Sequence, residues 1–248
     1  MNTPNQDQKS FFRFACGFEL AIGLVGVVLS LLLGPDFTLF LPSLTNLPSI
    51  GSGIAFGLLA ALPTVLAVWW MMKLPWESIQ ELKRFGEHPA VRRLLALDPA
   101  RLILLSLCSG IGEELAFRGW LLPWLLEFSE SFVAGDPLMN VDLLPIVVAV
   151  GVSSLLFGVV HPHTRLYMAV TGLIGIYYAG LLILTDNLLV PIVAHAAHNA
   201  AQFLMSRQEM VREVPSNPMH FDGGEAWEDR LDEWDQGFDE PDEAPSRD

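Results

Sequence analysis

The sequence predicts an all-α fold, a polytopic transmembrane helix bundle of about six spans with both termini cytoplasmic. Three observations lead to this prediction. The chain of 248 residues is 52% hydrophobic and only 17% charged, whereas a soluble domain is usually nearer a quarter charged. Its mean hydropathy is +0.41, and its apolar residues gather in long runs. Apart from Arg118 and the tail, its basic residues lie before the first run, after the last, or in alternate connections between the runs.

Six apolar segments are expected to span the bilayer: 14–33, 51–72, 102–126, 144–161, 166–184 and 187–205. Segments of about 18 or more apolar residues match a hydrocarbon core of about 30 Å. The first is interpreted as a span, not a secretory signal, because no small-residue cleavage site precedes Gly34. We therefore expect a multi-pass protein of the cell membrane, with the lipid bilayer as its first partner.

Positive charge predicts the orientation of the spans. Basic residues flank the first span, fill the connection after the second, and follow the fourth and the sixth; they are Lys9, Arg13, Lys73, Lys83, Arg84, Arg92, Arg93, Arg101, Arg165, Arg207 and Arg212. The connections 35–50 and 127–143 carry no Lys or Arg. Because basic residues favour cytoplasmic connections, both termini are expected in the cytoplasm.

Two regions follow from composition: a transmembrane helical domain at 1–206 and an acidic tail at 207–248. Residues 209–248 carry a net charge of −11 out of −14 for the whole chain. Such a composition is expected to be disordered. Within the tail, Trp227, Leu231, Trp234 and Phe238 fall on one helical face. They could dock a protein partner, and scattered aromatics in a disordered tail are the alternative.

The connection at 74–100 mixes apolar and charged residues with partly helical spacing. It is expected to be a cytoplasmic amphipathic segment, either lying against anionic head groups or serving as a plain linker. Cys16 and Cys108 both fall inside expected spans. They are interpreted as small apolar packing residues, not as a disulfide or a CxxC redox site.

Ionisable residues inside the spans point to a functional site, because each is costly to insert, at about 2.5–3.5 kcal/mol. Glu113, Glu114 and Arg118 lie in the third span. Glu114 and Arg118 are spaced i, i+4 and can form an ion pair. Glu113 is rotated by about 100° on the helix and needs another partner.

Two further spans supply polar candidates. His161 ends the fourth span, and the sixth contains His195, His198 and Asn199. Glu113 and His195 are expected at similar depth, whereas His161 is expected nearer the cytoplasmic surface. A buried carboxylate can activate water as a general base, and a His with an Asn amide can stabilise an oxyanion. Each residue alone could equally be structural, as a link between helices.

The ordered motifs Glu113-Glu-x-x-x-Arg118, Phe157-x-x-x-His161 and His195-x-x-x-Asn199 resemble the CPBP family of CAAX-prenyl-protease-like (Abi-like) intramembrane proteases. The resemblance covers roughly 101–206. It implies that Glu113 activates water and that Glu114 pairs with Arg118.

The resemblance also implies that His161 positions the water and that His195 and Asn199 form the oxyanion hole. A metal-dependent alternative in the family would use Glu113, His161 and His195 as ligands of a divalent ion such as zinc. No cofactor is favoured, because an Asn amide suits hydrogen-bond donation better than zinc ligation.

Three functions are therefore open. The favoured one is an intramembrane endopeptidase with a Glu-activated water, acting on a membrane-anchored peptide or protein, with no nucleic-acid partner. The first alternative is a non-catalytic membrane scaffold or bacteriocin-immunity-type protein of the same fold. The second is a proton-coupled transporter, since buried Glu, Arg and His also form proton relays.

Overall fold

The computed structural model describes residues 4–133 and 143–213. Over these residues the chain is helical with no strand, which confirms the predicted all-α bundle. The helices are α1 (Pro4–Leu33), η1 (Phe37–Phe40), α2 (Leu47–Met71), α3 (Glu77–Gly86), α4 (Pro89–Leu95), α5 (Pro99–Glu114), η2 (Leu115–Leu121), α6 (Leu122–Val133), α7 (Leu143–Val159), α8 (Arg165–Thr185) and α9 (Leu189–Glu213). The tail aromatics and nearly all of the acidic tail lie outside the described residues.

The six expected spans each fall largely within one helix or one continuous helical stretch. By length and composition, α1, α2 and α8 can each cross a membrane. The helix α4 and the stretch Pro99–Ser131 could together form one further span, although they are bent by 111° relative to each other. The helix α7 is apolar but, at 17 residues, shorter than α1, α2 and α8. The count of six spans therefore stays a prediction.

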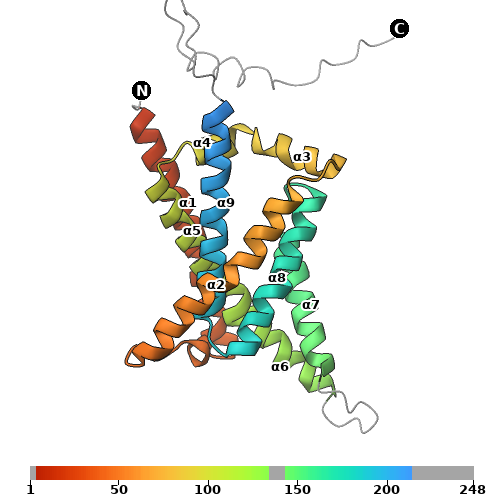
Figure 1. Ribbon diagram of the computed structural model, residues 1–248. Coiled ribbons are helices and arrows are strands. Elements are labelled where there is room, and N and C mark those ends of the chain that lie inside the picture. The colour runs from red at the N-terminus through yellow and green to blue at the C-terminus, as the bar shows by residue number, and fades with distance from the viewer. Residues whose placement is uncertain (1–3, 134–142, 214–248) are drawn as a thin grey trace, which may run out of the picture. The chain divides into compact units, whose positions relative to one another are not determined.

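The connections between helices alternate between two ends of the bundle (Figure 1). At one end, the ring of Phe85 in α3 stacks on His163 at 4.5 Å, and Arg207 Nε donates to Leu97 O at 3.2 Å. At the other end, the backbone N–H of Leu188 donates to Phe40 O at 2.7 Å. The connections rich in Lys and Arg thus share one end of the bundle, as the charge pattern requires. That this end faces the cytoplasm stays a prediction.

The expected amphipathic segment at 74–100 forms α3 and α4. Ile79 and Leu97 are fully buried and Leu95 is nearly so. The segment therefore packs on the bundle through its apolar face and is more than a loose linker. Lys83 and Arg84 lie in the last turn of α3, at the negative end of the helix dipole, where cations are favourable.

A close helix contact joins α1 to the stretch that begins with α5. A Cβ added to Gly23 would lie 2.8 Å from the Cα of Gly112, and one added to Gly26 would lie 2.5 Å from the Cα of Ala116. A Cβ on Gly112 would overlap the backbone carbonyl of Glu19. Small residues let membrane helices approach this closely, so α1 is held directly against the helix that carries Glu113.

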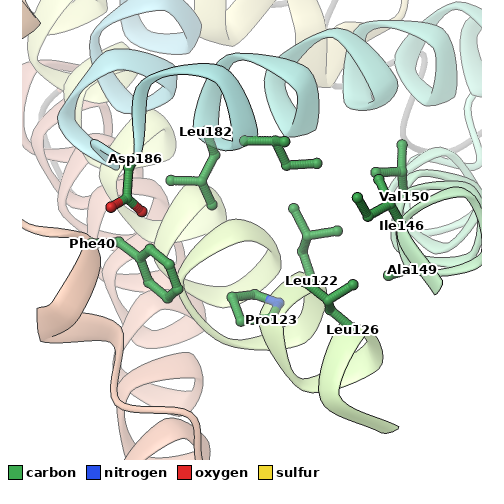
Figure 2. A pocket seen from close by; sticks show the side chains of 10 residues that line it. Phe40, Leu122, Pro123, Leu126, Ile146, Ala149, Val150, Leu182 and Asp186 are labelled. Atoms are coloured by element: carbon green, nitrogen blue, oxygen red, sulfur yellow. The ribbon is translucent and has the colours of Figure 1, made fainter. Parts of the chain in front are cut away.

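An apolar cavity of about 200 Å³ opens between η1, α6, α7 and α8. Figure 2 shows Phe40, Leu122 and Leu182 around it, with Asp186 at one edge. None of the predicted catalytic residues lines this cavity. It therefore does not mark the polar site described next.

Candidate functional site

Glu114 and Arg118 form a fully buried ion pair. Arg118 Nη1 donates to Glu114 Oε1 at 3.1 Å, and Arg118 Nη2 donates to the backbone carbonyl of Gly175 in α8 at 2.9 Å. The guanidinium also lies over the ring of Phe157 in α7, 4.3 Å from its centroid. The expected pair is thus present, and it links α5 to α7 and α8.

The segment that carries Arg118 is not an α-helix. η2 is π-helical, and the N–H of Leu122 bonds to Phe117 O, five residues back. The i, i+4 spacing was interpreted with a regular α-helix, so the π-helical turn was not predicted. The apolar pattern of the sequence gives no signal of such a turn. Wide turns of this kind occur often at functional sites, and this one directly follows the two glutamates.

Only one of the two carboxylate oxygens of Glu113 has a hydrogen-bond partner among the described residues. The side chain is 7% exposed. Ser109, one turn earlier on α5, donates to Glu113 Oε1 at 3.1 Å. Oε2 is buried without a hydrogen-bond partner among the described residues, and His161 Nε2 lies 3.5 Å from it. A buried carboxylate oxygen without a donor is costly and is a natural place for a water or substrate proton.

His161 reaches Glu113 from the turn after α7. Its Nδ1 lies 2.7 Å from the carbonyl of Phe157 and donates to it, which turns Nε2 toward Glu113. The expected difference in depth does not keep the two residues apart, since His161 follows the end of α7 at Val159 and its Nε2 still approaches Glu113. Phe85 of α3 stacks on His163 in the same turn. Burial, and then the charge of His161, lower the pKa of His163.

His195 pairs with Glu114, not with Glu113. Its Nδ1 lies 2.8 Å from Glu114 Oε1, the oxygen that also accepts from Arg118. The imidazole stacks on Tyr178 at 5.2 Å and meets the edge of Phe157 at 6.0 Å. These contacts fix the ring and leave Nε2 as the nitrogen available for chemistry.

Asn199 joins the site through Ser109. Its Nδ2 donates to Ser109 Oγ at 3.0 Å, and Ser109 in turn donates to Glu113. An amide nitrogen carries two hydrogens, so one remains for a ligand. His198, which has no place in the motif, faces away and contacts Thr64 in α2 at 2.9 Å. Ser109 was missed, since a Ser inside a span carries no distinctive signal.

The predicted residues thus gather at one place. His161, Glu113, Ser109 and Asn199 form a connected chain of contacts, and His195 joins through Glu114, the neighbour of Glu113. Sequence reasoning missed a further carboxyl, that of Glu19 in α1, which lies within hydrogen-bonding reach of Glu113. Its signal was available, because Glu19 is an ionisable residue inside an expected span.

The residues do not form a ready metal site. Within residues 4–133 and 143–213, no three His, Cys, Asp or Glu side chains are arranged to hold a metal ion. Glu113 and His161 approach each other, and His195 contacts Glu114 through Nδ1, which leaves its Nε2 open. The metal-dependent alternative that uses Glu113, His161 and His195 therefore stays a prediction, and no step below uses a metal.

Comparison with protein families finds that residues 96–201 match the family described as type II CAAX prenyl endopeptidase Rce1-like. This confirms the predicted resemblance to CAAX-protease-like proteins, a group of peptide-bond hydrolases. No curated protein and no solved structure matches the chain. The motif residues from Glu113 to Asn199 lie inside the matched segment, whereas Glu19 lies outside it. With its apolar helices, the chain is an integral membrane protein.

Proposed function

Because residues 96–201 are Rce1-like, we propose that this protein is an intramembrane endopeptidase that hydrolyses a peptide bond with water activated by Glu113. The observation that carries the proposal is Glu113 Oε2, buried without a hydrogen-bond partner in the described chain and facing His161. The substrate class is a peptide or protein held at the membrane, and the site of action is the cell membrane.

The first step is attack by water. A water hydrogen-bonded to both Glu113 Oε2 and His161 Nε2 gives one proton to the carboxylate, and its oxygen adds to the substrate carbonyl carbon. Ser109 steadies Glu113 from the other oxygen. His161 accepts the second hydrogen of the water, since its Nδ1–H is committed to Phe157 O. This orients the attacking lone pair.

The second requirement is stabilisation of the oxyanion. The free N–H of Asn199 and the Nε2–H of His195 can donate to the developing negative charge. His195 donates from Nε2 only as an imidazolium, because its Nδ1–H already faces Glu114. Glu114 Oε1 holds the imidazole in place through Nδ1. The C–N bond then breaks, and the proton on Glu113 passes to the leaving amine.

The test uses full-length protein in lipid vesicles with a library of membrane-tethered peptides. Wild type should cleave at least one peptide, and Glu113→Gln should abolish cleavage while its unfolding temperature stays near that of wild type. Glu127→Gln makes the same chemical change at an exposed glutamate on α6 and should cleave normally. Cleavage by Glu113→Gln at the wild-type rate, or none by wild type, would overturn the proposal and favour a scaffold.

A further inference from the structure

Glu19 lies on a face of α1 that is made of small residues. Cys16, Glu19, Gly23 and Gly26 follow one another at helical spacing. Across the contact, the Cys16 thiol is within hydrogen-bonding distance of Cys108 in α5. The backbone carbonyl of Glu19 lies where a side chain at position 112 would be. Gly112 directly precedes Glu113, so this close contact brings Glu19 next to the site.

Among the described residues, no Lys or Arg is a neighbour of the Glu19 carboxyl. Its Oε2 is buried without a hydrogen-bond partner among the described residues, as is Oε2 of Glu113. Arg118, the one arginine of the site, is committed to Glu114 and Gly175. The groups near Glu19 are another carboxyl, Glu113, and the imidazoles of His161 and His195.

Two ionised carboxyls this close in a medium of low dielectric constant repel each other, so one of them retains a proton. Glu113 already accepts a hydrogen bond from Ser109, which favours its ionised form. Glu19 Oε2 accepts no such hydrogen bond among the described residues. The proton therefore resides on Glu19, which converts a repulsive pair into a donor and an acceptor.

We propose that Glu19 is a second carboxyl of the site, a positioning residue that donates a hydrogen bond to Glu113 and directs its carboxylate toward His161. The proposal rests on the proposed function for its catalytic consequence. It adds a residue from α1, outside the Rce1-like segment. Glu19 transfers no proton to substrate in this role.

Substitution separates this role from simple packing. Glu19→Gln keeps a neutral donor of nearly the same shape and should retain kcat within a few-fold, whereas Glu19→Ala removes the donor and should lower kcat by about tenfold or more. Glu127→Gln is the matched control. If Glu19→Ala and Glu19→Gln had the same kcat while Glu113→Gln was inactive, the positioning role would be wrong and the proposed function would stand.

Infrared spectroscopy provides a readout that needs no activity. Wild type should show a carboxylic-acid C=O band that is absent in Glu19→Gln, unchanged in Glu127→Gln and shifted in frequency in Glu113→Gln. Loss of the band in Glu19→Gln together with the shift would support the pair even if no peptide were cleaved. A spectrum of Glu19→Gln identical to wild type in this region would overturn it.

Discussion

His195 Nδ1 lies 2.8 Å from Glu114 Oε1, so the sixth expected span is tied to Glu114 and not to Glu113, the proposed base. The same oxygen accepts from Arg118. Glu114 therefore contacts both a buried arginine and a histidine of the proposed oxyanion hole. The two adjacent glutamates have different partners. Ser109 and His161 contact Glu113, whereas Arg118 and His195 contact Glu114.

Glu114→Gln should reduce both stability and activity. The amide leaves Arg118 buried without its counter-ion, and breaking such a pair costs about 3–5 kcal/mol. It also removes the carboxylate that contacts His195 Nδ1. Thermal unfolding in detergent and cleavage rates on the folded fraction measure the two effects. A Glu114→Gln protein as stable as wild type would contradict the dual role of Glu114.

Asn199→Ala should lower the cleavage rate by about 10²–10³, the usual effect of losing one oxyanion donor. Asn199→Asp should be at least as harmful, because it places negative charge where negative charge develops. Rates on one tethered peptide compare the variants, and thermal unfolding controls for the lost contact with Ser109. Activity retained in Asn199→Asp would argue against an oxyanion hole at this residue.

Gly112→Ala should push α1 away from α5, because the new methyl group would meet the carbonyl of Glu19. Overpacking of this kind costs about 1–3 kcal/mol. Gly17→Ala is the matched control, since nothing lies within 4 Å of a Cβ there. Oxidative cross-linking of Cys16 to Cys108, followed by mass spectrometry, should fall in Gly112→Ala only. Equal cross-linking in both variants would show that Gly112 does not set this contact.

Cleavage should persist after exhaustive chelation and dialysis, because the proposed mechanism uses only side chains. Bound metal must be measured in the same preparation, since a buried ion can exchange slowly. Activity lost on chelation and restored by zinc or another divalent ion, with about one metal per chain, would replace the glutamate mechanism with a metal-dependent one.

Both ends of the chain should lie in the cytoplasm. The helix ends rich in Lys and Arg share one end of the bundle (Figure 1), and positive charge favours the cytoplasmic side. A reporter fused after Asp248 should be active only in its cytoplasmic form, and one inserted at 134–142 only in its external form. The opposite pattern would reverse the orientation.

The sequence by itself determined the helical membrane fold and the main site residues. Helices are formed by local backbone bonds, and a bilayer selects for apolar length, so both signals can be read along the chain. The cost of an ionisable group in a span likewise marks Glu113, Glu114 and Arg118 without any structure. The spacing of Glu114 and Arg118 also allowed their ion pair to be predicted.

Only the tertiary structure decided which of these groups meet. The pairing of His195 with Glu114, the link from Asn199 through Ser109 to Glu113, and the approach of Glu19 all join residues far apart in sequence. Their distances depend on where each helix is broken and how closely its neighbour packs. The π-helical turn after Glu114 and the glycine contact at Gly112 set those positions, because helix packing is decided by the shapes of both surfaces and not by either sequence alone.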